Sequence, residues 1–82
     1  MQQFAITTLF DCKIGKVYKI VRCSLDDEVK NRLYEMGLVP NTTVTVSKKA
    51  PLGDPLQISL RGYSLCVRGT VAKQFVVEEL PD

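Results

Sequence analysis

Apolar and polar residues alternate along much of this 82-residue chain, with a period that predicts short β-strands. The alternation covers residues 16–23, 43–47 and 56–60, then Leu65 with Val67, and finally Phe75 with Val77. Val21 interrupts the first of these patterns, which indicates either a bulge or a strand that is buried on both faces near its end. The pattern therefore predicts about five strands, each with one buried face.

One segment has a helical period instead. Val29, Leu33 and Met36 are spaced i, i+4 and i+7, which predicts a short helix with a narrow apolar stripe after the first predicted strand. Ser24 or Asp26 can cap the free amides at its N-terminus, where acidic side chains also suit the helix dipole. A helix of this length is marginal alone, so we expect it to pack against the sheet.

Turn-forming residues separate these elements. Gly37 suits the end of the helix, Leu38 can fold back as its hydrophobic contact, and Asn41 tolerates a positive φ at the following turn. Arg61-Gly62-Tyr63 predicts a tight turn, and one helical turn is expected at residues 70–73. With no repeat or flexible linker, residues 1–82 form one domain: mainly β, a small, partly open barrel with one short helix inserted after the first strand.

The composition limits the chemistry. The chain contains no histidine and no tryptophan, so it lacks the commonest general base and the commonest metal ligand. Without a base–nucleophile pair, a phosphate-binding glycine loop or a nucleophile motif, we expect no enzyme activity and no cofactor. The net charge of +2 and the scattered basic residues argue against a nucleic-acid partner.

Neither the cysteines nor the apolar segments predict a specialised site or a membrane span. Cys12, Cys23 and Cys66 are isolated, and no C-x-x-C is present, so no zinc or redox site is predicted. No stretch approaches the length of a membrane span and the N-terminus does not resemble a leader, so we expect a cytoplasmic protein without direct membrane insertion. Strand edges of an open barrel could still pair weakly between copies.

One segment exceeds what the fold needs, and a second allows two interpretations. The connector at residues 50–55 contains two prolines and an apolar Leu52, which is consistent either with a rigid corner whose leucine plugs the barrel end or with a preformed recognition loop. The apolar residues around Gly37 are consistent either with core and cap positions or with an exposed patch for a partner. On the second interpretation a docking surface would contain Glu35, Met36, Gly37, Leu38 and Val39 together with Leu52, Gly53 and Asp54.

Several segments in order resemble the FeoA family of small proteins of bacterial ferrous iron uptake. Residues 32–40, RLYEMGLVP, look like the family's R-L-x-E-[ML]-G-[LF]-x-P, and the resemblance continues through APLGDP at 50–55, RGY at 61–63, LCVR at 65–68 and the segment 72–78. Asn41 stands where the family usually has glycine, and none of the cysteines is a signature position. The resemblance implies an SH3-like barrel.

The same resemblance implies a function. It predicts a non-enzymatic accessory or regulator that binds the cytoplasmic, GTP-hydrolysing part of the FeoB transporter. The alternatives are a metal-responsive or metal-carrying domain, which anaerobic calorimetry with ferrous iron would distinguish, and a nucleic-acid-binding small barrel. The last predicts salt-dependent binding through Lys48, Lys49, Arg61 or Arg68.

Overall fold

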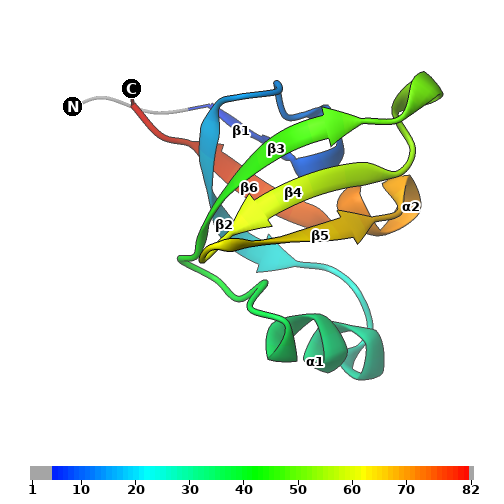
Figure 1. Cartoon of the computed structure of the whole chain (residues 1–82). Helices are drawn as coiled ribbons and strands as arrows, with labels where there is room; N and C mark the ends of the chain where they lie inside the picture. The colour runs from blue at the N-terminus through cyan, green and yellow to red at the C-terminus, as the bar shows by residue number, and fades with distance from the viewer. Residues whose placement is uncertain (1–4, 82) are drawn as a thin grey trace.

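A single antiparallel sheet bends around its own core in the computed structural model, which describes residues 5–81 (Figure 1). The strands follow the spatial order β1-β6-β2-β3-β4-β5, so β1 and β5 are the two edges. In chain order the elements are β1 (Ile6–Thr8), the 3₁₀ helix η1 (Leu9–Asp11), β2 (Val17–Cys23), α1 (Asp27–Glu35), β3 (Thr43–Lys49), the 3₁₀ helix η2 (Pro51–Gly53), β4 (Leu56–Leu60), β5 (Tyr63–Val67), α2 (Gly69–Ala72) and β6 (Phe75–Glu79).

The mainly β class and the five predicted strands are confirmed, but the sheet contains a sixth strand. This is β1, three residues long, which pairs with β6 through Ile6 and Glu78, Thr7 and Val77, and Thr8 and Val76. A strand of three residues is too short to show an alternating pattern, so the sequence does not reveal it. As a result the helix follows the second strand of the structure, where the sequence placed it after the first.

The core lies inside the bend of the sheet. Its buried side chains come from one face of each strand from β2 to β6, with Leu9, Cys12, Leu38 and Ala72 added from outside the strands. The full set is Leu9, Cys12, Tyr18, Ile20, Leu38, Val44, Val46, Leu56, Ile58, Leu60, Val67, Ala72, Phe75 and Val77. Full burial of a large apolar side chain contributes about 1.5–3 kcal/mol, so this set supplies the main stabilisation.

Two irregularities help the sheet to bend. The register between β2 and β6 shifts between Ile20 and Arg22, which confirms the bulge interpretation of Val21; Val21 itself is 38% exposed, so the strand is not buried on both faces there. A second shift, between Val46 and Lys48, bends β3 against β4. Bulges increase the local twist of a strand, and here they allow one sheet to cover its own inner face.

The helix α1 begins and ends as its sequence predicts. The Asp26 side chain accepts a hydrogen bond from the Val29 amide at 3.2 Å, and Gly37 has a φ of +103° just beyond the helix. Leu38 then turns back into the core and is fully buried. No α1 residue is itself buried, so the helix is attached to the sheet mainly through its two ends and half-buried side chains such as Leu33.

Within residues 5–81 no helix is long and apolar enough to cross a membrane.

The three cysteine thiols differ in their surroundings: Cys12 is buried, Cys23 is half-buried and Cys66 is exposed. Burial raises the pKa of the Cys12 thiol to about 12, because the thiolate would lose its hydration inside the core.

The end of α1 gives a first prediction. A Cβ on Gly37 would lie 2.6 Å from the Tyr63 hydroxyl, whereas a Cβ on Gly15, which also has a positive φ of +88°, meets nothing within 4 Å. Gly15→Ala should therefore cost only the backbone strain, about 1–2 kcal/mol. Gly37→Ala should cost about 1 kcal/mol more, because the exposed Tyr63 side chain must move away and lose its hydrogen bond to Met36. Urea unfolding of both variants measures the difference, and equal losses would contradict the close contact.

Burial of Cys12 gives a second prediction. The unfolded thiol ionises near its ordinary pKa of 9.0, but the folded thiol keeps its proton until about pH 12. The contribution of Cys12 to the free energy of unfolding is thus complete below pH 9.0 and decreases as the pH rises toward about 12. Unfolding of wild type and Cys12→Ala across this range should show a steeper loss for wild type; parallel curves would mean that Cys12 is solvated.

Candidate functional site

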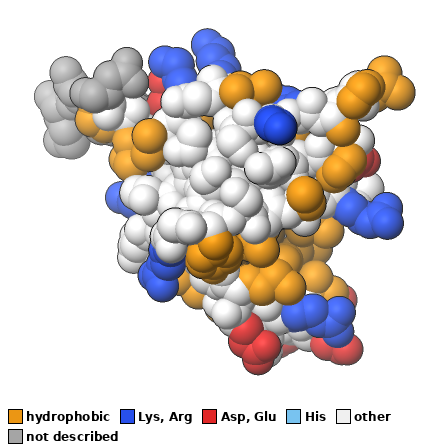
Figure 2. Space-filling view, in the orientation of Figure 1, with side chains coloured by type: hydrophobic (Ala, Val, Ile, Leu, Met, Phe, Trp, Pro, Cys, Tyr) orange, Lys and Arg blue, Asp and Glu red, His pale blue; other side chains and the backbone are white. Residues whose placement is uncertain are grey.

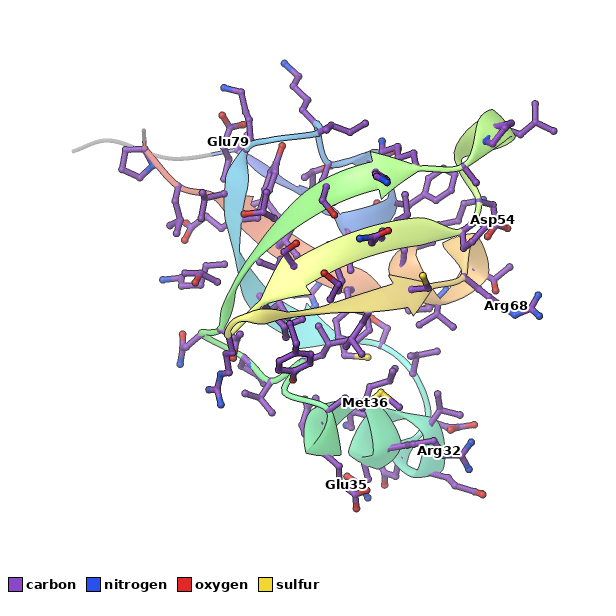
Figure 3. All side chains as sticks on the ribbon, in the orientation of Figure 1. Arg32, Glu35, Met36, Asp54, Arg68 and Glu79 are labelled. Carbon is purple, nitrogen blue, oxygen red and sulfur yellow. The ribbon has the colours of Figure 1, made fainter. Side chains whose placement is uncertain are left out.

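The predicted docking residues at the end of α1 form a short corner between the helix and β3 (Figure 3). Glu35 is the last residue of α1 and is exposed, and Met36 keeps 41% of its surface accessible. Gly37 and Val39 are half-buried. Within a few residues, this corner therefore exposes a charged side chain, an apolar side chain and part of the main chain.

Leu38 does not belong to the exposed part of this corner. Its accessible surface is 0%, so it cannot contact a partner and its inclusion in the docking surface is wrong. The alternative interpretation, in which Leu38 is the hydrophobic contact that ends the helix, describes its place correctly. Its burial anchors the corner to the barrel.

Tyr63 is a part of this corner that the sequence did not reveal. Its hydroxyl donates a hydrogen bond to the Met36 carbonyl oxygen, which joins the start of β5 to the end of α1. Tyr63 itself remains 43% exposed. The turn before it was predicted correctly, with Arg61 at φ +49° and Gly62 at φ +85°, but a contact across 27 positions leaves no local pattern.

The tip of the connector at residues 50–55 is also exposed to solvent. Leu52 is 100% exposed and has a positive φ of 69°, so the interpretation that it plugs the barrel end is wrong. Gly53 is the last residue of the 3₁₀ helix η2. The alternative interpretation, an exposed and preformed loop, agrees with this geometry.

Asp54 has a structural task in the same loop. Its Oδ1 accepts a hydrogen bond from the Gly69 amide at 2.9 Å, at the first residue of α2. A Cβ on Gly69 would lie 3.2 Å from the Asp54 Cγ and 2.9 Å from the Phe10 ring, so the loop, α2 and η1 meet closely here. The carboxylate thus fixes the base of the loop while Leu52 projects from its tip.

The structure does not bring the two predicted segments together. Figure 1 shows α1 at the bottom of the molecule and η2 at the upper right, with β4 and β5 between them. The labelled Glu35 and Met36 and the labelled Asp54 are similarly far apart in Figure 3. One continuous surface made from both segments is therefore wrong, and each must be considered separately.

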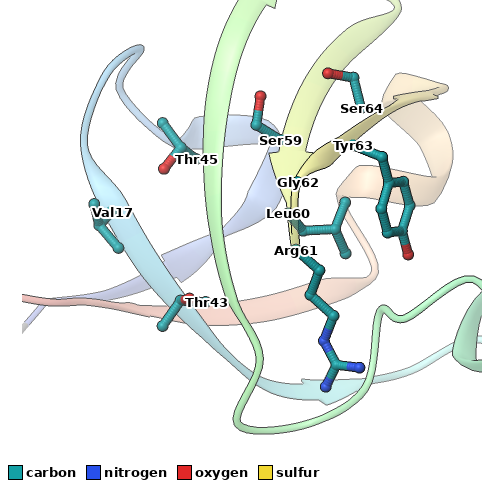
Figure 4. A pocket seen from close by; sticks show the side chains of 9 residues that line it. All are labelled: Val17, Thr43, Thr45, Ser59, Leu60, Arg61, Gly62, Tyr63 and Ser64. Carbon is teal, nitrogen blue, oxygen red and sulfur yellow. The ribbon is translucent and has the colours of Figure 1, made fainter.

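A polar groove, absent from the sequence prediction, lies on the outer face of the sheet (Figure 4). Its volume is about 520 Å³, and residues from β2 to β5 line it: Val17, Thr43, Thr45, Ser59, Leu60, Arg61, Gly62, Tyr63 and Ser64. Arg61 supplies its one charged group among these lining residues, and no carboxylate or thiol enters it. The groove can offer hydroxyl groups to a ligand, but its lining contains no pair of groups for acid–base catalysis.

Three ion pairs form elsewhere among the described residues, one of them between Lys30 and Asp27 at the start of α1. Lys16 lies 3.3 Å from Glu79 and Lys19 lies 3.6 Å from Glu78, so the acidic end of β6 pairs with lysines in β2 and directly before it. Within the described part of the chain, His, Cys, Asp and Glu side chains form no group of three that could hold a metal ion.

Comparison with known proteins identifies the fold. The model of the FeoA domain family matches residues 7–79. The chain is similar to an FeoA-like protein from Clostridium acetobutylicum, with 33% identity over 100% of this chain and 93% of that one, and a TM-score of 0.82. It is also similar to the FeoA protein of Chlorobium tepidum, with 29% identity over 92% of this chain and 71% of that one, and a TM-score of 0.85.

A third similar structure is the zinc complex of FeoA from Stenotrophomonas maltophilia, described as an SH3 domain protein. It shares 25% identity over 87% of this chain and 88% of that one, with a TM-score of 0.74. No curated protein matches the sequence. The family model covers nearly the whole chain, from β1 to the end of β6, and this chain therefore belongs to the FeoA domain family.

Proposed function

We propose that the chain is a non-enzymatic accessory protein of bacterial ferrous iron uptake, which acts in the cytoplasm by binding the GTPase-containing part of an FeoB-like transporter. The match to the FeoA family over residues 7–79 carries this proposal. One similar structure is described as an iron uptake regulatory protein, and the Stenotrophomonas relative as a candidate activating factor of ferrous iron transport.

The corner between α1 and β3 supports a role in docking. Met36 is 41% exposed and Tyr63 is 43% exposed. The hydrogen bond between them joins the end of α1 to the start of β5 before any partner binds. A site that is already ordered loses little conformational entropy on binding. Large, partly exposed apolar and aromatic side chains of this kind are common anchors at protein interfaces.

A regulator that changes the nucleotide affinity of a GTPase must distinguish the nucleotide states of its partner. If the chain changes the affinity of the transporter for one nucleotide, then by linkage it binds one nucleotide state more tightly. Regulation of this kind therefore predicts that the affinity of the chain differs between the GDP-bound and the GTP-bound cytoplasmic part.

Titration of the chain into the cytoplasmic part of the transporter tests this proposal. We expect binding in at least one nucleotide state. Calorimetry, or the fluorescence of a labelled chain, measures this binding. Met36→Glu should weaken it by about tenfold or more, because a charge replaces an apolar anchor. Absence of binding in every nucleotide state would contradict the proposal.

Two matched variants locate the surface. Ile14→Glu adds the same charge at an apolar side chain that is 56% exposed, in the segment between η1 and β2, and should leave the affinity unchanged. Leu52→Glu places the charge on the fully exposed tip of η2. If Leu52→Glu weakens binding and Met36→Glu does not, the connector and not the corner is the docking site.

A further inference from the structure

The edge strand β5 has one side without a neighbouring strand. It pairs with β4 alone. Tyr63, Leu65 and Val67 lie opposite Leu60, Ile58 and Leu56, and between these pairs Ser64 and Cys66 lie opposite Ser59 and Gln57. The two-residue turn makes Leu60 and Tyr63 the closing hydrogen-bonded pair of the hairpin. By alternation, the amides and carbonyls of Ser64 and Cys66 point away from β4, toward the open edge.

These backbone groups are not used elsewhere. Among the turn, loop and cap hydrogen bonds of residues 5–81, none involves the main chain of Ser64 or Cys66. The side chains of both residues are exposed on the outer face, Ser64 beside the polar groove. Such a row of donors and acceptors is a template for an added strand.

Both ends of the open edge carry an arginine. Arg61 precedes β5 in the hairpin turn and Arg68 follows it directly; both are exposed, and neither forms an ion pair among the described residues. Figure 3 shows Arg68 extending from the end of β5 into solvent. Antiparallel pairing of two copies along β5 would bring arginines of the two copies close together, which like-charge repulsion disfavours. An acidic segment is attracted by the same arrangement.

Apolar side chains lie along the inner side of this edge. Tyr63 and Met36 are each about two-fifths exposed, and Leu33 and Leu65 are half-buried against the core. Figure 2 shows hydrophobic side chains gathered between the polar sheet face and the charged helix at the bottom of the molecule. A strand added to β5 would direct alternate side chains toward these residues and the others toward the polar outer face.

We propose that β5 binds an extended segment of a partner protein as an additional strand, and that this segment alternates apolar and polar residues and has acidic residues near its ends. The main chain of Ser64 and Cys66 would hold the backbone, and Arg61 and Arg68 would pair with the acidic ends. The inference rests on the proposed function, for which it names the mode of docking and the chemistry of the partner segment.

The backbone part is tested by removing a donor without disturbing the hairpin. Cys66→Pro deletes an amide that points away from β4, so the β4–β5 ladder can persist, while Cys66→Ser keeps the amide and changes only the side chain. The probe is a labelled nine-residue peptide with alternating threonine and valine at its centre and two glutamates at each end. We expect fluorescence anisotropy to show binding to wild type and Cys66→Ser, and binding at least about tenfold weaker to Cys66→Pro. Equal binding by Cys66→Pro and Cys66→Ser would overturn the proposal.

A second test, of the arginine charges, does not depend on whether Cys66→Pro folds. Arg68→Glu should weaken the peptide complex by about tenfold at low salt, and by less at high salt because the charges are screened. Arg22→Glu, an exposed arginine on β2, makes the same charge change and should have no effect. A peptide with lysines in place of the glutamates should not bind wild type; if it binds equally well, the proposal is wrong.

The same variants separate this inference from the proposed function. If the cytoplasmic part of the transporter binds wild type, Cys66→Pro and Arg68→Glu equally, docking exists but does not use β5, and only the strand-addition proposal fails. If the transporter part binds none of them, the proposed function fails. A concentration-dependent dimer that Cys66→Pro abolishes would identify a second copy as the occupant of the edge and overturn the proposal of an acidic segment.

Discussion

A single sheet must bury its own inner face, and the rest of the structure depends on this constraint. With only short helices available, no second layer can cover the apolar side of β2 to β6. The sheet therefore bends, with register shifts in β2 and β3 at the points of curvature. Residues from outside the strands, among them Leu9, Leu38 and Ala72, complete the enclosure.

This solution leaves the sheet with two edge strands, β1 and β5. The helix α1 is attached beside β5 by the buried Leu38 and the hydrogen bond from Tyr63 to Met36. The helix therefore contributes little to the core but fixes an apolar corner next to an unpaired strand edge. The residues that end α1 in the core therefore also shape the surface beside β5.

Local patterns predicted most of the fold. Alternation predicted β2 to β6, the break at Val21 predicted a real bulge, and glycine or asparagine marked turns that do have positive φ, as at Gly37 and Asn41. These features depend on neighbours in the sequence, so the sequence shows them directly. The strand β1 was missed because three residues cannot display a period.

The candidate site was less accessible to such patterns. Leu38 and Leu52 are both leucines beside a glycine, yet one is fully buried and the other fully exposed. The difference follows from where each turn points in the assembled barrel. The contact between Tyr63 and Met36, the distance between the corner and η2, and the unpaired edge of β5 likewise arise only when the strands are placed in order.

We propose that this family member docks through β5, one of the two edge strands of its sheet. Amide hydrogen exchange, followed by NMR on the chain alone and in complex with the cytoplasmic part of the transporter, tests it most directly. We expect the Ser64 and Cys66 amides to exchange rapidly in the free chain, unlike the Leu65 amide, and to become protected in the complex. Protection of both amides in the free chain, or a complex in which their exchange is unchanged, would contradict it.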